Sequence, residues 1–279
     1  MSISRRNFIQ QGLVYSAAAL TPGLNTLAAT ENRIERIGIQ LYTLRDRMAR
    51  DVKGTLGALA EIGYSEVEFA GYFDHSASRI REMLNELGLA SPSAHIPLEA
   101  LEADAGQTID AAATAGHKYI VVPYLMPARR VSIDQYRKLA EQFNKFGELC
   151  ARSDIQFAYH NHDFEFAAID SVVPYDLLLD ETDPELVKME LDLFWLKKAQ
   201  GNPMEYFQRY PQRFPLCHVK DMNAAGDMVD VGRGSIDFAR VFKHIEKAGL
   251  KHFFVEHDAP TDSMESALFS YNTVDSLRF

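Results

Sequence analysis

Histidine, carboxylate and lysine side chains recur in pairs, two residues apart, in the second half of the sequence. The pairs are His160 and His162, Glu190 and Asp192, His218 and Lys220, and Glu256 and Asp258. Imidazole nitrogens and carboxylate oxygens without a thiolate suit Mn²⁺, Mg²⁺, Co²⁺ or Zn²⁺. Such side chains therefore hold a divalent metal ion or form a purely structural salt-bridge network, and acids or imidazoles on four consecutive strand ends favour the metal.

Composition excludes several other classes of protein. The 279 residues are 47% hydrophobic and 24% charged, which describes a chain with a large core rather than a disordered or fibrous one. A net charge of −10 argues against nucleic acid and anionic membranes as partners. The two cysteines, Cys150 and Cys217, lie in apolar segments far apart, so we interpret both as packing residues.

Eight short β-rich segments, each followed by a helical pattern, must position these side chains. They cover residues 37–42, 66–71, 91–96, 119–124, 155–162, 187–194, 216–221 and 253–258. Two of the intervening helices are expected to end at Gly63 and Gly88. Eight βα units without a dividing linker predict one α/β domain, a (β/α)8 TIM barrel over residues 30–279. A doubly wound open sheet would usually show a glycine-rich phosphate loop after its first strand, and none follows residues 37–42.

The alternation within each strand predicts which side chains face the lumen of the barrel. In residues 187–194, for example, Met189 and Leu191 fall on one face and Glu190 and Asp192 on the other. The apolar face must meet the helices. The lumen is then expected to contain His95, Glu68, His160, His162, Glu190, Asp192, His218, Lys220 and Glu256. Most of them lie near the C-terminal strand ends, where barrel active sites are built.

The first 29 residues differ in composition and are predicted to be a signal peptide. The run Ser4 to Gln10, SRRNFIQ, resembles the twin-arginine export motif, and small residues at Ala28 and Ala29 mark a cleavage site. The apolar stretch between them is too short for a permanent membrane anchor. We therefore expect a periplasmic protein, and because this export route moves folded proteins, a cofactor acquired before export.

The sequence resembles a known family, the xylose-isomerase-like TIM barrels of the sugar phosphate isomerase/epimerase group. The motifs are YHNHDFEF (159–166), ELDLFW (190–195), CHVKD (217–221) and FVEHD (254–258), and the resemblance spans the whole mature chain. It implies one divalent ion, manganese first, with magnesium, cobalt or zinc as alternatives. Three implied ligands are Asp192, His218 and Glu256; the fourth is Glu165, reached from the loop, with His160 as the alternative.

The resemblance also implies the chemistry. A metal ion polarises the carbonyl of a ketose while a base removes the neighbouring C–H proton, giving an enediolate that is reprotonated as an isomer or epimer. The family favours Glu256 and the ligand from the fifth strand as the acid/base pair, and the chemistry of imidazole adds His160. In the segment VGRGSIDF (231–238), relatives often carry an acidic residue where this chain has Arg233, which is expected to alter substrate contacts.

Other residues have a substrate-binding and a structural interpretation. His95 and His162 bind hydroxyl groups, relay protons or are merely structural, and Glu68 is grouped with them as a substrate-binding candidate. Lys220 binds a substrate oxygen or pairs with Asp258 or Glu190. Trp195 and Phe194 stack on a sugar ring or pack in the core. Glu190 is interpreted as structural support for Asp192.

Export narrows the substrate to an unphosphorylated sugar, a polyol or a glycoside with an oxidised carbon. The principal prediction is an isomerase or epimerase; the alternative is a 3-keto-glycoside lyase that uses the same proton abstraction to expel a leaving group. An endonuclease IV-like phosphodiesterase would need a basic DNA face, and a sugar-binding protein would need two lobes with a hinge. Neither pattern is present, and a homodimer would be ordinary for such a barrel.

Overall fold

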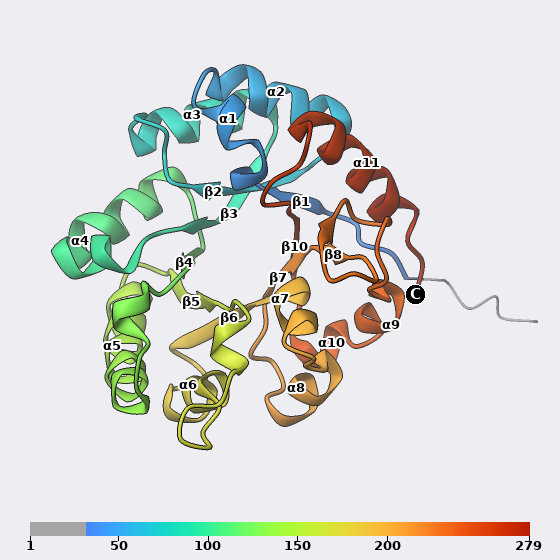
Figure 1. Cartoon of the computed structure of the whole chain (residues 1–279). Helices are drawn as coiled ribbons and strands as arrows, with labels where there is room; N and C mark the ends of the chain where they lie inside the picture. The colour runs from blue at the N-terminus through green and yellow to red at the C-terminus, as the bar shows by residue number, and fades with distance from the viewer. Residues whose placement is uncertain (1–31) are drawn as a thin grey trace, which may run out of the picture. The chain divides into compact units, whose positions relative to one another are not determined.

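The computed structural model describes residues 32–279, and these form a closed barrel of eight parallel strands surrounded by helices (Figure 1). The predicted signal peptide lies outside the described residues. In ring order the neighbours are β1-β2-β3-β4-β5-β6-β7-β10. The strands are β1 (Ile37–Gln40), β2 (Glu66–Ala70), β3 (Ala90–His95), β4 (Tyr119–Val122), β5 (Gln156–His160), β6 (Val187–Asp192), β7 (Leu216–Val219) and β10 (His252–Val255). The predicted fold class is confirmed, with most strands slightly shorter than predicted.

The outer layer consists of the helices that follow the strands. They are α1 (Arg45–Met48), α2 (Val52–Ile62), α3 (Ala77–Leu87), α4 (Leu98–Ala115), α5 (Ile133–Ala151), α6 (Pro174–Glu181), α7 (Leu193–Lys198), α8 (Pro203–Arg209), α9 (Phe238–Phe242), α10 (Ile245–Ala248) and α11 (Ser263–Ser276). The predicted ends of α2 and α3 are confirmed, since Gly63 and Gly88 adopt φ of 122° and 68°. No helix within residues 32–279 is long and apolar enough to cross a membrane.

A small hairpin after β7 was not predicted. It pairs β8 (Asp221–Met222) with β9 (Met228–Val229), and the carboxylate of Asp221 accepts hydrogen bonds from the backbone N–H groups of Gly232, Gly234 and Ile236.

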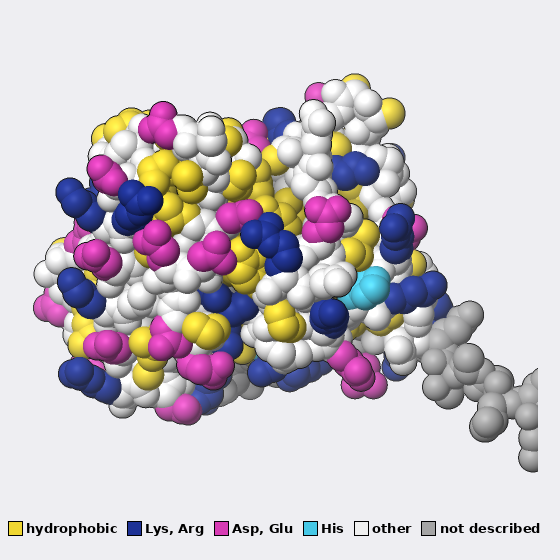
Figure 2. Space-filling view, turned by 90° about the horizontal axis from the view of Figure 1, so that it is seen from below, with side chains coloured by type: hydrophobic (Ala, Val, Ile, Leu, Met, Phe, Trp, Pro, Cys, Tyr) yellow, Lys and Arg dark blue, Asp and Glu magenta, His cyan; other side chains and the backbone are white. Residues whose placement is uncertain are grey.

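On the side of the barrel below α6 and α8, acidic and basic side chains are interspersed (Figure 2).

The strand alternation separates two kinds of interior. Side chains such as Phe157, Met189 and Leu191 belong to the large apolar core. The lumen has its own apolar cluster, formed by Tyr119, Val121, Ala158, Leu216 and Phe254. Gly38 leaves room for the ring of Phe254, because a Cβ atom there would lie 2.5 Å from it. This cluster fills the lumen below the polar residues, which are themselves almost inaccessible to solvent.

Close packing of α5 against the start of β6 gives a stability prediction. A Cβ atom on Gly147 would lie 2.6 Å from the backbone oxygen of Leu186, whereas one on Gly57 in α2 meets its nearest neighbour at 3.7 Å. Gly147→Ala should lower the free energy of unfolding by about 1–3 kcal/mol through overpacking. The matched variant Gly57→Ala should leave it unchanged or raise it by up to about 1 kcal/mol. Urea denaturation measures both; equal effects would contradict the packing argument.

Candidate active site

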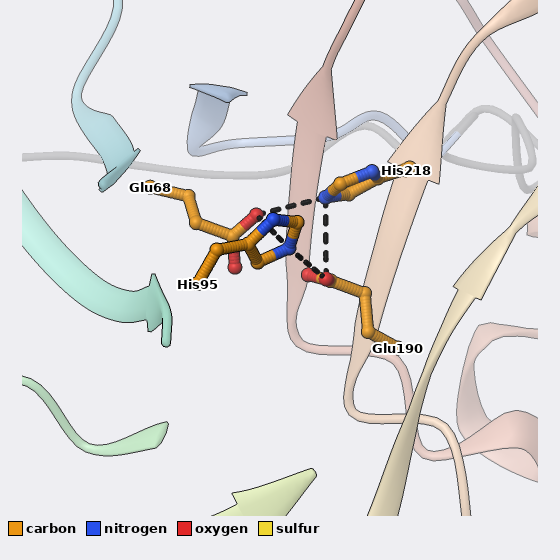
Figure 3. A group of neighbouring side chains, drawn as sticks. All are labelled: Glu68, His95, Glu190 and His218. Atoms are coloured by element: carbon orange, nitrogen blue, oxygen red, sulfur yellow. Dashed lines mark hydrogen bonds and ion pairs between the residues drawn. The ribbon is translucent and has the colours of Figure 1, made fainter. Parts of the chain in front are cut away.

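Four buried side chains meet in the lumen from β2, β3, β6 and β7, and we call them the deep group: Glu68, His95, Glu190 and His218 (Figure 3). They form two imidazole–carboxylate pairs. His218 Nε2 lies 2.8 Å from Glu68 Oε2, and His95 Nε2 lies 2.7 Å from Glu190 Oε2. Both rings therefore carry their proton on Nε2 in this arrangement, because an ionised carboxylate only accepts hydrogen bonds.

Glu68 is oriented by two further donors. Gln40 Nε2 donates to its Oε2 at 2.7 Å, and Ser93 Oγ donates to its Oε1 at 2.6 Å. A carboxylate fixed in this way holds the ring of His218 in one orientation and in one tautomer. The other ring nitrogen, Nδ1, then faces the rim of the barrel, 2.7 Å from Glu256 Oε2.

A second set of four, the rim group, contains His160, Asp192, Glu256 and again His218, and all four are buried. One donor atom from each lies within 4.8 Å of the other three. His160 Nε2 lies 3.3 Å from Asp192 Oδ2, and His218 Nδ1 lies 2.7 Å from Glu256 Oε2. The side chains come from β5, β6, β7 and the end of β10, four neighbours in the ring.

The rim group brings two imidazole nitrogens and two carboxylates together in a buried site, a donor set that a divalent ion can use. His160 Nδ1 donates to the backbone oxygen of Pro123 at 3.0 Å, which turns its Nε2 towards the carboxylate of Asp192. His218 Nδ1 lies 2.7 Å from Glu256 Oε2, an oxygen that Lys220 Nζ also approaches to 2.8 Å. The surrounding carboxylates raise the pKa of His218 well above its usual value, so the site attracts positive charge, and its imidazole and carboxylate groups fit a divalent cation in place of that proton.

The deep group contains the same donor types but fits an ion less well. Its two imidazole nitrogens already donate protons to the two carboxylates. An ion bound there would have to displace those protons, and Glu68 also accepts from Gln40 and Ser93. We therefore assign the metal-binding geometry to the rim group and an orienting role to the deep group.

Lys220 neutralises part of the acidic rim. Its Nζ lies 3.1 Å from Asp192 Oδ2, 2.8 Å from Glu256 Oε2 and 2.8 Å from Asp258 Oδ1. Burial alone would lower the pKa of Lys220, but these three carboxylates outweigh it and raise that pKa well above its usual value. Burial likewise disfavours ionised Glu256, yet Lys220 and His218 lower its pKa below the usual range. Both side chains are therefore charged at neutral pH.

Glu165 lies away from this cluster. It follows β5 in a short 3-10 helix (Phe164–Phe166), is fully buried, and accepts hydrogen bonds from the hydroxyl of Tyr159 and from the backbone N–H of His162. Tyr159 points to the helices and not to the lumen. The structure thus places His160, the alternative fourth ligand, beside Asp192, and the role of Glu165 as a ligand stays a prediction that requires its carboxylate to leave Tyr159.

Three candidate substrate-binding residues have different surroundings. His162 lines the pocket, and burial lowers its pKa to about 2, so the ring is neutral at ordinary pH, and its role in binding hydroxyl groups stays a prediction. The ring centre of Trp195 lies 5.2 Å from that of His162, and Trp195 is not part of the pocket lining. Arg233 pairs with Asp230 at 3.2 Å and stacks over Phe269, outside the pocket lining.

The pocket above the rim group has a volume of about 490 Å³. Its polar lining comes from His95, His160, His162, Lys220, Glu256 and Asp258. The volume and the mixed lining are typical of small-molecule sites. The position at the C-terminal strand ends is where barrel enzymes hold their substrates.

Sequence reasoning missed the residues that orient the site. Gln40 lies on the lumen face of β1, and the alternation applied to the later strands would have identified it in the segment IGIQLY. Ser93 follows the same rule in β3. The backbone oxygen of Pro123 had no signal, because the contact depends on how the loop after β4 folds.

Comparison with known proteins places this geometry in a family. Residues 56–272 match the family described as the xylose isomerase-like TIM barrel. An inosose dehydratase from Clostridium botulinum (strain Eklund 17B / Type B) is 29% identical over 128 residues, which cover 39% of this chain and 42% of that protein. The chain thus spans less than half the length of this curated relative.

Solved structures give the same fold. A sugar phosphate isomerase/epimerase from Parabacteroides distasonis ATCC 8503 has a TM-score of 0.75 and 25% identity, over 90% of this chain and 97% of that chain. The IolI protein, solved with a zinc atom bound, has a TM-score of 0.69 and 14% identity, over 85% of this chain and 96% of that chain.

The buried carboxyl group of Glu165 predicts a pH-dependent stability. Burial raises its pKa to about 7, whereas the unfolded chain ionises at the usual value of 4.5. Folding then favours the protonated form, so this group should reduce the free energy of unfolding by roughly 3 kcal/mol as the pH rises from about 4.5 to 7. Glu165→Gln should remove this contribution.

Denaturant unfolding at several pH values gives the free energy of unfolding as a function of pH. The slope of that dependence is compared between the wild type and the variant. Glu148→Gln, an exposed substitution in α5, is the control and should keep the wild-type slope. An unchanged slope in Glu165→Gln would show that this carboxyl group ionises normally.

Proposed function

Because the chain belongs to the xylose isomerase-like TIM barrel family, we propose that it is a divalent-metal-dependent isomerase or epimerase of an unphosphorylated keto sugar. The reaction proceeds through an enediolate. The observation that carries the proposal is the rim group, in which one donor atom each from His160, Asp192, His218 and Glu256 lies within 4.8 Å of the others in a buried site. The sugar isomerase/epimerase neighbour and the zinc bound in the IolI structure support it.

The residues that would hold the ion are His160, Asp192, His218 and Glu256, and we propose manganese, with zinc, cobalt or magnesium as alternatives. Their mixed nitrogen and oxygen donors suit such ions. When bound, a divalent ion supplies Lewis-acid polarisation of a substrate carbonyl. Glu68, by fixing the tautomer of His218, keeps the ligand nitrogen directed at the rim.

Proton transfer is assigned to residues on the same side of the pocket. Glu256 is ionised and lines the pocket, so its carboxylate is placed to remove the C–H proton and return it to the neighbouring carbon or the opposite face. His160 shares this role in the alternative arrangement in which Glu165 is the fourth ligand, because its Nε2 is then not bound to the ion. Lys220 contributes a permanent positive charge against the developing oxyanion. The neutral ring of His162 accepts a hydrogen bond from a sugar hydroxyl or donates one to it.

A second outcome of the same first step is elimination, the reaction of a keto-glycoside lyase or a dehydratase. The relatives named inosose dehydratase favour it, since a dehydratase expels water. The enediolate then loses a leaving group from the carbon next to it instead of regaining a proton. The product distinguishes the two outcomes: an isomeric sugar of unchanged mass, or two fragments.

Proton abstraction is tested by incubating the protein with keto sugars and keto-glycosides in D₂O. We expect deuterium to be incorporated at the carbon next to the carbonyl, which NMR detects. We also expect about one equivalent of metal per chain. Asp192→Asn and Glu256→Gln should lower both metal content and exchange, the latter by at least about 100-fold, because each removes a ligand charge.

The control is Glu102→Gln, a surface carboxylate paired with Arg129, which should keep full metal content and exchange. Metal retained at wild-type levels in both rim variants would show that the ion lies elsewhere. Absence of exchange with every keto compound would remove the enediolate mechanism.

We also propose that the chain is exported to the periplasm by the twin-arginine route, on the motif Ser4 to Gln10. Replacing both Arg5 and Arg6 with lysine should retain the protein in the cytoplasm at its precursor mass. Cell fractionation followed by mass spectrometry measures this. Wild-type protein found in the cytoplasm with residues 1–29 intact would contradict the assignment.

A further inference from the structure

The pocket is divided into two unlike halves. The side chains that end β5, β7 and β10 supply its charged wall, with His160, Lys220 and Glu256. The half built on β1 to β4 is mainly apolar, and we call it the aromatic notch: Tyr42, Ala70, Gly71, Pro97, Pro123 and Tyr124. The proposed chemistry uses the charged half only, which leaves the notch without a role.

Two tyrosines form the sides of the notch, and both are exposed. Tyr42 follows β1 and is 43% exposed, while Tyr124 follows β4 and is 37% exposed. Each is held by an arginine from its own loop. Arg45 lies 4.2 Å from the centre of the Tyr42 ring and donates to the Tyr42 backbone oxygen at 2.8 Å. Arg130 donates to the Tyr124 hydroxyl at 2.9 Å. The rings are therefore oriented before any ligand binds.

Small residues keep the space between the tyrosines open. Ala70 follows Glu68 on the lumen face of β2, one pleat closer to the rim. Gly71 has φ of 81°, and a Cβ atom there would find no neighbour within 4 Å. Larger side chains at these two positions would fill the notch. The combination of two aromatic walls and an open floor is suited to a flat or ring-shaped group.

We propose that the aromatic notch is a second subsite, which binds an uncharged ring attached to the reacting keto sugar. The inference rests on the proposed function for the placement of the reacting ring against His160 and Glu256. The pocket of about 490 Å³ exceeds the needs of one pyranose. The natural substrate class is then a glycoside or disaccharide whose second ring stacks on Tyr42 and Tyr124.

The charges around the notch exclude an anionic group in that position. Arg45 and Arg130 are engaged with the tyrosines and do not line the pocket. Lys220 is shared by three carboxylates. Among the described residues that line the pocket, none offers an uncommitted cation to a phosphate.

Calorimetric titration with compounds that cannot react tests the subsite directly. Phenyl glucoside should bind at least about 3- to 10-fold more tightly than methyl glucoside, the gain expected of a stacked ring. Tyr42→Ala and Tyr124→Ala should each reduce this ratio towards one, and Tyr42→Phe should retain it. Ala70→Leu should weaken phenyl glucoside while leaving methyl glucoside nearly unchanged.

Val131→Ala is the control, since Val131 is exposed but lies outside the pocket lining. Equal affinity for the two glucosides, no binding of phenyl glucoside, or tighter binding of glucose 6-phosphate would each overturn the subsite. These titrations do not depend on catalysis, so deuterium exchange without a ring preference rejects the notch alone. A ring preference without exchange rejects the proposed reaction alone.

Discussion

An excess of buried negative charge in a closed lumen is the constraint on which the site depends. Glu68, Glu190, Asp192 and Glu256 are all nearly inaccessible to solvent, and Asp258 lies beside them. Within residues 32–279, Lys220 is the one lysine or arginine that pairs with any of these five carboxylates, and it contacts three of them: Asp192, Glu256 and Asp258. Uncompensated charges in such a place cost several kcal/mol each. The arrangement is stable only if protons on imidazoles or a divalent ion supply the missing positive charge.

His218 connects the two ways of supplying that charge. Its Nε2 donates to Glu68 and its Nδ1 faces Glu256, so the same ring belongs to the deep group and to the rim group. If Nδ1 binds an ion, the ring cannot also be an imidazolium. The positive charge of the deep group must then come from His95, which lies between Glu68 and Glu190. Burial lowers the pKa of His95, but the two carboxylates together outweigh burial and raise it.

Much of this could be predicted because strand alternation is a local rule with a global result. Residues as far apart as Glu68 and His218 reach one point, since every lumen-facing residue of a parallel barrel points to the same axis. Local rules do not reach the loops. Glu165 was predicted as a ligand from its type and distance along the chain, but a buried tyrosine hydroxyl competes for its carboxylate. Likewise, the positions of Tyr42 and Tyr124 depend on arginine contacts that no periodicity encodes.

The two halves of the pocket differ in how freely their residues can be substituted. Substituting a rim residue changes the charge balance of the whole lumen, because Lys220 and His218 each contact several carboxylates. Substituting Tyr42 or Ala70 changes only the shape of the notch. In the reaction proposed above, one barrel can therefore keep a single proton-abstraction centre while its β1 to β4 loops select different substrates.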